Sequence, residues 1–233
     1  MSNNNISSHS KKEILVLYGS QTGNSEAAAI QISNAIPDKF KSDGYSSRHM
    51  QLDDFLEYEK CKWSPIVIIV TSSYGVGQAP LGAYRFREFC DAINEDDGSK
   101  KFLSGLKYAL LGLGDSKYTT FFQNPTKVDE ALRKAGATRI GEVGKADASG
   151  PQLEIIDAWI GKLWNILKQE CDQELSLPQE AIDQSWNLCV KLFPHFAPTN
   201  QNSSHQNLMM AALFAIIIYL SVTIIMQKLP NDS

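Results

Sequence analysis

Residues 14–25 read ILVLYGSQTGNS, an apolar strand that runs into a short polar loop. The loop contains hydroxyl and amide side chains and two glycines, and a helix-forming stretch follows it directly. Backbone N–H groups at the start of a helix point outward and together carry about half a positive charge. Ser20, Thr22 and Asn24, with the N–H groups of residues 21–25, can therefore hold a phosphate monoester without a Lys or Arg side chain.

This loop differs from two common nucleotide-binding motifs. No Gly-Lys-Ser/Thr follows it, so it is not a Walker A loop, and with only Gly19 and Gly23 it is not G-x-G-x-x-G. A nucleoside triphosphate or a dinucleotide is therefore less expected as the ligand. Taken alone, the same residues are also compatible with a polar turn in which Ser or Asn caps a helix.

Two further loops follow strand-like segments. Residues 65–71, PIVIIVT, are a β-branched run of the kind that is buried on both faces of a parallel sheet, and SSYGVGQAP comes after them. Residues 107–112, KYALLG, run into LGDSKYTTFF. Each loop contains glycine, which permits close backbone approach, and one tyrosine. We expect Tyr74 and Tyr118 against the two faces of a flat aromatic ring.

With the residues around them, the three loops resemble the FMN domain of the diflavin reductase family over about residues 12–168. The segment from Ser20 to Asn24, SQTGN, is similar to the phosphate loop of flavodoxins. The runs most similar to the methionine synthase reductase branch are residues 106–121, 127–132, 136–137, 144–147 and 157–160. Residues 74–77, YGVG, instead resemble the cytochrome P450 reductase branch.

The resemblance implies FMN as the cofactor and places its site. Residues 20–25 would bind the phosphate, residues 72–75 would line the ring and ribityl chain, and residues 113–122 would close the other face. The implied cofactor-binding residues are Ser20, Gln21, Thr22, Gly23, Asn24, Ser25, Ser72, Ser73, Tyr74, Gly75, Leu113, Gly114, Asp115, Tyr118, Phe122 and Asp147. Many relatives carry acidic residues near Val76 and Gln78, and their absence here bears on partner preference and flavin potential, not on FMN binding.

The order of predicted elements indicates an α/β fold. Strands are expected at residues 13–18, 46–51, 66–71, 107–112 and 139–143, and helices at residues 25–36, 82–94, 125–135 and 153–170. This alternation predicts a flavodoxin-like, doubly wound, five-stranded parallel sheet in the order 2-1-3-4-5, with the ligand outside the carboxyl ends of the strands. The length of 233 residues suits one domain, residues 12–170, with appendages.

The other strong signal lies near the carboxyl end. Residues 208–226, LMMAALFAIIIYLSVTIIM, carry no charge. As a helix they would be about 28 Å long, close to the roughly 30 Å of bilayer hydrocarbon. We predict a single transmembrane helix here, with a helix that mediates oligomerisation as the alternative. A short tail, residues 227–233, follows it.

The remaining segments suggest how the domain is placed. Residues 1–11 are polar, lack an apolar signal-peptide core and are expected to be disordered. We therefore expect a tail-anchored protein with its domain in the cytosol, and the single basic residue beyond the span, Lys228, favours the endoplasmic reticulum over the mitochondrial outer membrane. Residues 171–207 are predicted to be a linker whose amphipathic stretch, residues 182–193, docks on the domain or lies at the bilayer surface, the former being favoured.

Composition limits the chemistry. The four cysteines show no metal-binding spacing, which indicates reduced thiols, and no metal site or catalytic side-chain set is predicted. The formal net charge is −4 with no basic patch, so nucleic acid is not an expected partner. The acidic residues 95–97 either steer basic redox partners or are simply solvated.

The function predicted from these features is that of a membrane-tethered FMN electron carrier, a component of an oxidoreductase system. The resemblance implies that it accepts electrons from a separate FAD/NADPH reductase. It would pass them singly to a haem, cobalamin or iron–sulfur acceptor, for which a protein on the same membrane is a natural candidate. Two alternatives are a self-sufficient NAD(P)H-dependent quinone reductase, for which no nucleotide fingerprint is present, and a non-redox scaffold or competitor of a diflavin reductase.

Overall fold

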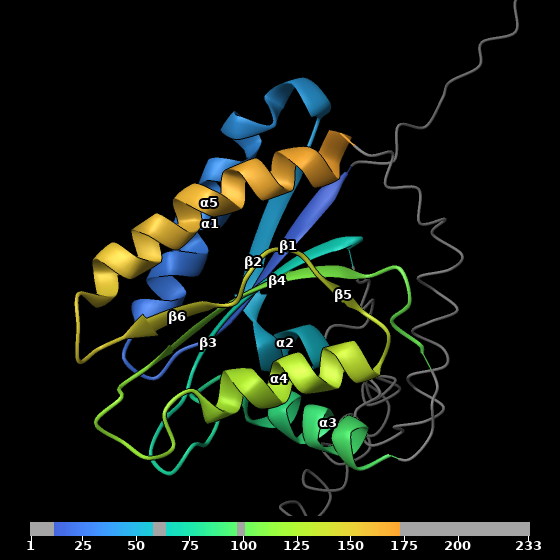
Figure 1. Ribbon diagram of the computed structural model, residues 1–233. Helices are drawn as coiled ribbons and strands as arrows, with labels where there is room; N and C mark the ends of the chain where they lie inside the picture. Colours follow the sequence, from blue (N-terminus) through green and yellow to red (C-terminus); the bar gives the residue numbers. More distant parts are fainter. Residues whose placement is uncertain (1–11, 58–63, 97–100, 173–233) are drawn as a thin grey trace, which may run out of the picture. The chain divides into compact units, whose positions relative to one another are not determined.

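The computed structural model describes residues 12–57, 64–96 and 101–172 (Figure 1). In chain order the elements are β1 (Glu13–Gly19), α1 (Asn24–Lys39), a 3₁₀ turn (Lys41–Asp43), β2 (Ser46–Gln51), α2 (Leu52–Glu57), β3 (Ile66–Ser72), α3 (Tyr84–Glu95), β4 (Lys107–Gly114), α4 (Gln123–Lys134), β5 (Thr138–Arg139), β6 (Gly144–Asp147) and α5 (Gln152–Asp172). The predicted helices and first four strands are all present, with bounds that differ by at most three residues.

The strands form one parallel sheet in the order β2-β1-β3-β4-β5, and β6 also pairs with β4. Successive residues of a strand face opposite sides, so each central strand contributes to two cores. One core packs against α1 and α5, and the other against α2, α3 and α4. Figure 1 shows these two sets of helices above and below the sheet. The doubly wound α/β fold and the predicted strand order are confirmed.

The predicted fifth strand at residues 139–143 is wrong. Its place is taken by β5 and β6, which pair with the two ends of β4 through Tyr108 opposite Arg139 and Leu111 opposite Gly144. Gly141 lies between them with φ +68°, a left-handed conformation that a strand cannot continue through. The sheet of the described residues therefore has six strands instead of five.

The short helix α2 is a further element that the sequence pattern did not indicate. It carries Asp53, whose carboxylate accepts hydrogen bonds from the backbone N–H groups of Tyr84 at 3.0 Å and Phe86 at 2.9 Å. These N–H groups belong to the first turn of α3, where a helix has no acceptor of its own. Asp53 thus caps α3 from a different helix, which fixes the carboxyl-terminal side of the loop that follows β3.

Several predictions fall outside the described residues. These are the disordered segment at residues 1–11, the linker from residue 173 onward with its amphipathic stretch at 182–193, the transmembrane helix at 208–226 and the tail at 227–233. Within the described part of the chain, no helix combines the length and apolar character needed to cross a bilayer.

Candidate functional site

A cavity of about 400 Å³ lies at the carboxyl ends of β1, β3 and β4. This volume is in the range of small-molecule and cofactor sites. The position is also the expected one, because the strand order reverses direction between β1 and β3 and ligands of doubly wound sheets bind at such a point. The predicted site residues that line it are Gln21, Thr22, Asn24, Ser25, Ser72, Ser73, Tyr74, Gly75, Leu113, Gly114, Asp115 and Tyr118. Ser20, Gly23, Phe122 and Asp147 do not line the cavity.

The loop between β1 and α1 is held in a fixed shape. Gly23 adopts φ +93°, and its N–H donates to the Ser20 hydroxyl at 3.0 Å. Ser20 and Gln21 are in turn bonded to the backbone of Leu81, through the Ser20 N–H at 3.0 Å and the Gln21 side-chain oxygen at 3.3 Å. Ser20 and Gly23 therefore shape the loop instead of facing the cavity.

The start of α1 provides unpaired donors to this cavity. Helix geometry leaves the N–H groups of Asn24, Ser25 and Glu26 without an acceptor inside the helix, and no other acceptor for them occurs among the described residues. The side chain of Thr22 is exposed on the same loop, while Ser25 is buried. Because the helix dipole adds partial positive charge here, the loop suits a phosphate group.

The loop after β3 forms a second wall. Tyr74 and Gln78 exchange backbone hydrogen bonds at 3.0 and 2.8 Å, which closes a tight turn. Gly77 sits in this turn with φ +86°, and a Cβ there would lie 1.8 Å from the Gln123 side-chain oxygen. The turn therefore requires glycine, and it packs directly on the start of α4. The Thr120 hydroxyl donates to the Gly75 carbonyl at 3.2 Å, linking this wall to the loop after β4.

A buried hydrogen-bonding centre beneath this wall was not indicated by the sequence. Asn124 is 1% exposed, and its amide donates to the Thr71 hydroxyl at 3.2 Å and the Ser72 carbonyl at 3.0 Å. The side-chain oxygen of Asn124 accepts from Arg87 at 3.1 Å, and the backbone N–H of Asn124 donates to the Ser73 hydroxyl at 3.0 Å. No role was predicted for Asn124 from the sequence, because these hydrogen-bond partners lie 37 to 53 positions away along the chain.

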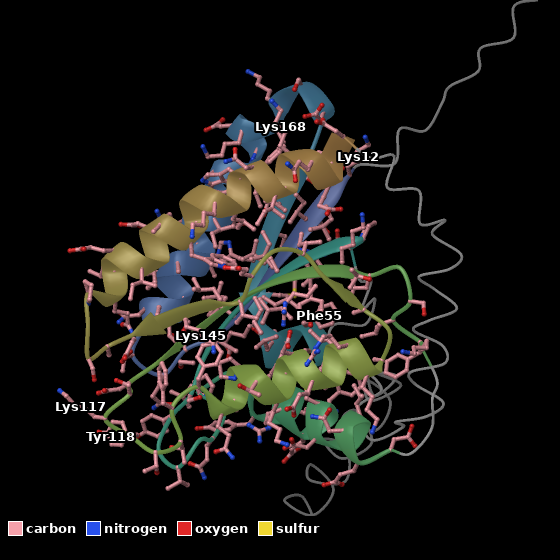
Figure 2. All side chains as sticks on the ribbon, in the orientation of Figure 1. Lys12, Phe55, Lys117, Tyr118, Lys145 and Lys168 are labelled. Atoms are coloured by element: carbon pink, nitrogen blue, oxygen red, sulfur yellow. The ribbon has the colours of Figure 1, made fainter. Side chains whose placement is uncertain are left out.

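Two tyrosines line the cavity from different loops. Tyr74 is 49% exposed and Tyr118 is 62% exposed. In Figure 2, Tyr118 lies beside Lys117 at the lower left, on the loop after β4 and clear of the helices. Exposed aromatic faces next to a cavity are suited to covering a flat ligand ring. The structure places both residues at the cavity, and their predicted stacking on the two faces of one ring stays a prediction.

Phe121, not Phe122, faces the cavity. Phe122 is 7% exposed with φ +65°, and its ring lies against Gly112, where a Cβ would be 2.3 Å from a ring carbon. The glycine in β4 thus lets the Phe122 ring lie against the sheet, and the half-buried Phe121 ring lies against Gly114, where a Cβ would be 2.9 Å from a ring carbon. Thr120 and Phe121 fall within the predicted range of residues 113–122, whereas Ala148 and Gln152, which also line the cavity, lie outside the predicted ranges.

Two aspartates organise the third wall. The Asp147 carboxylate accepts from the N–H groups of Ser116 and Ser149, each at 2.9 Å, and Asp115 accepts from the Lys117 N–H at 3.0 Å and from the Ser149 hydroxyl. Hydrogen bonds from Ser116 lower the pKa of Asp147, and those from Ser149 and Lys117 lower the pKa of Asp115. Both carboxylates are therefore ionised at neutral pH, and Asp147 shapes the loops without lining the cavity.

Comparison with known proteins identifies relatives of this chain. The family model described as Flavodoxin matches residues 16–159. Methionine synthase reductase from Bos taurus is 33% identical over 159 residues, which are 68% of this chain and 22% of that protein. NADPH--cytochrome P450 reductase from Saccharomyces cerevisiae is 34% identical over 167 residues, 71% of this chain and 23% of that protein. The matched region thus spans less than a quarter of either relative.

Solved structures support the fold. Oxidised Flavodoxin 2 from Bacillus cereus matches with a TM-score of 0.51 at 22% identity, and the match covers 68% of this chain and 99% of that one. At this level of identity the likeness concerns the arrangement of the sheet and helices alone. It agrees with the doubly wound order of the strands described above.

Proposed function

Because the chain belongs to the flavodoxin family, whose model matches residues 16–159, we propose that it is a membrane-anchored FMN electron carrier. The family and the relatives among reductases identify the described region as a flavodoxin-type FMN electron-transfer domain related to diflavin reductases. The membrane anchor, the electron donor and the electron acceptor are the further parts of the proposal.

The observation that carries the proposal is the composition of the cavity. At one end it has hydroxyls and the unpaired N–H groups of α1, with no Lys or Arg among its lining residues. At the other end it has two half-exposed tyrosines and Phe121. A phosphate monoester joined to a flat aromatic ring by a polar chain satisfies both ends, and FMN has this form. When bound, FMN supplies one-electron redox chemistry.

The protein residues have defined tasks toward that cofactor. Thr22 and the N–H groups of Asn24 and Ser25 would hold the phosphate, and Ser72 and Ser73, which also line the cavity, would contact the ring and the ribityl chain. Tyr74, Tyr118 and Phe121 would cover the ring and exclude water from it. The lining residues serve to bind and orient the cofactor, and in this proposal no side chain takes a covalent part in electron transfer.

The donor in this proposal is a separate reductase that carries FAD and uses NADPH. The relatives named above are reductases, one of which is described by its name as using NADPH, and this supports an NADPH-dependent reductase as the source of electrons. The acceptor would hold haem, cobalamin or an iron–sulfur centre. Adding NADPH to the FMN-loaded chain tests the donor. We expect reduction only when an FAD-containing reductase is also present, and reduction without it would contradict the proposal.

The proposed anchor is the uncharged segment of residues 208–226. Its length and apolar character support a single membrane span. In this proposal the flavodoxin domain lies in the cytosol, at the endoplasmic reticulum. Attachment to one membrane raises the effective concentration of partners on the same membrane. We expect the full chain to stay with membranes after extraction at alkaline pH and a chain ending at residue 172 to be released. Release of both would contradict the anchor.

A further inference from the structure

Gln152 lines the cavity beside the start of α1. It is the first residue of α5, and its side chain is hydrogen-bonded to that of Asn24, the first residue of α1. Its side chain is half-buried, and it contacts three parts of the chain that are distant in sequence. No role was predicted for it from the sequence, because a glutamine after a Gly-Pro turn reads as an ordinary helix start.

The hydrogen bonds of Gln152 fix the orientation of its amide. Its nitrogen donates to the carbonyl oxygens of Ala146 at 3.1 Å and Gly114 at 3.4 Å. Backbone carbonyls can only accept, so the NH₂ group must face them. The Gln152 oxygen is then directed toward Asn24, whose side-chain nitrogen donates to it at 2.9 Å. Two carbonyl groups on β4 and β6 thereby determine which way the amide points.

The orientation of the Gln152 amide determines that of the Asn24 amide. Its side-chain NH₂ group must face Gln152, because the Gln152 oxygen is an acceptor only. One N–H of that group is used in this bond, and the other remains available for an anion beside the start of α1. Asn24 is therefore held as a donor next to the unpaired backbone N–H groups of the same turn. A freely rotating asparagine would present its oxygen as readily, which would repel a phosphate.

We propose that Gln152 is a positioning residue of the phosphate site, which holds the Asn24 amide as a donor and so strengthens binding of the phosphate group of a flavin. The inference rests on the proposed function, since it takes FMN as the ligand. It explains how a cradle without Lys or Arg in its lining recruits a further donor from a side chain. Through its hydrogen bonds to Asn24 and to the Gly114 carbonyl, Gln152 also joins the start of α1 to the end of β4. It thereby fixes the spacing between the phosphate end of the cavity and the third wall.

A second glutamine provides a matched control. Gln31 lies on α1, and its side-chain nitrogen donates to the Asp157 carboxylate of α5 at 3.5 Å. This pair also links α1 with α5, but both side chains are exposed and neither lines the cavity. Removal of either glutamine takes one side-chain link away from the same two helices. Only removal of Gln152 should change the phosphate site.

The experiment is a titration of the flavin-free full chain with FMN and with riboflavin, which lacks the phosphate. We expect Gln152→Ala to weaken FMN binding by about fivefold, the usual scale of one hydrogen bond, and to change riboflavin binding by less than about twofold. Gln152→Glu should weaken FMN binding more, because a carboxylate would lie near the phosphate and could not donate to the two carbonyls. Gln31→Ala should change neither affinity.

The result of the double variant distinguishes positioning from general support. If Gln152 acts through Asn24, the variant Asn24→Ala/Gln152→Ala should bind FMN no more weakly than Asn24→Ala alone. Equal loss of FMN and riboflavin affinity in Gln152→Ala, or effects that simply add in the double variant, would overturn the inference. If the unmodified chain binds FMN and Gln152→Ala binds it with the same affinity, the inference about Gln152 is overturned and the proposed function stands. Failure of the unmodified chain to bind FMN would overturn the proposed function as well.

Discussion

Replacing Thr22 by aspartate is expected to lower FMN affinity by at least about 100-fold. Thr22 lines the cavity on an exposed part of the loop before α1, and no Lys or Arg lines the cavity to offset a new negative charge. Two like charges about 4 Å apart repel by about 4 kcal/mol at an effective dielectric constant of 20, and solvent screening leaves roughly 3 kcal/mol. Titration of the flavin-free variant with FMN, followed by flavin fluorescence, measures the loss.

Two comparisons show whether the effect of Thr22→Asp comes from the phosphate. Thr22→Asn has a similar size and no charge, so FMN binding should weaken by about tenfold or less. Riboflavin carries no phosphate, and its affinity for Thr22→Asp should stay close to that of the unmodified chain. The fold itself should not suffer, because a carboxylate at a helix start is stabilised by the helix dipole. Unchanged FMN affinity in Thr22→Asp would mean that the phosphate lies elsewhere.

The second large effect concerns stability. We expect Asp129→Ala to lower the free energy of unfolding by about 3 kcal/mol, at the lower end of the range for breaking a buried ion pair. Asp129 is 8% exposed, and its carboxylate accepts from the Tyr108 hydroxyl at 2.6 Å and from Arg139 at 2.7 Å, and it forms an ion pair with Arg133 at 3.1 Å. Tyr108 is fully buried, so its hydroxyl would lose its carboxylate acceptor in the variant. The lower end applies because both arginine side chains are partly exposed.

Thermal unfolding measures this effect. A loss of about 3 kcal/mol corresponds to a decrease in Tm of roughly 6–12 °C for a domain of this size. The neighbouring residue provides the control, since Glu130 pairs with Lys127 at 3.5 Å and both side chains are largely exposed. Glu130→Ala should change stability by about 0.5 kcal/mol or less. Equal Tm values for Asp129→Ala and Glu130→Ala would show that the buried network does not contribute to stability.

The parts of the fold that the sequence predicted are those determined locally. The apolar run at residues 66–70 is buried on both faces of the sheet, and β2 has the predicted bounds. The loop before α1 could be predicted as a candidate phosphate site because its donors lie within a few residues of one another. These features depend on short-range patterns, so they do not require knowledge of the packing.

The parts that the sequence did not predict depend on contacts between distant segments. The fifth strand is divided at Gly141, and the order of glycine and apolar residues at 139–143 gives no sign of a left-handed φ. Phe121 lines the cavity in place of the predicted Phe122, because Gly112 leaves space on β4 in which the Phe122 ring lies. Asn24 and Gln152 are 128 positions apart, so their pairing emerges only from the assembled sheet.

The most direct test of the central claim is anaerobic reduction of the full chain after it has been loaded with FMN. The account predicts that the unmodified chain retains FMN in equimolar amount and that Thr22→Asp does not. It also predicts that NADPH bleaches the flavin absorbance of the unmodified chain only after a catalytic amount of an FAD-containing diflavin-type reductase is added. The account would be contradicted if the chain were colourless after incubation with excess FMN and removal of the unbound flavin. It would also be contradicted if NADPH alone reduced the bound FMN as fast as NADPH with the reductase.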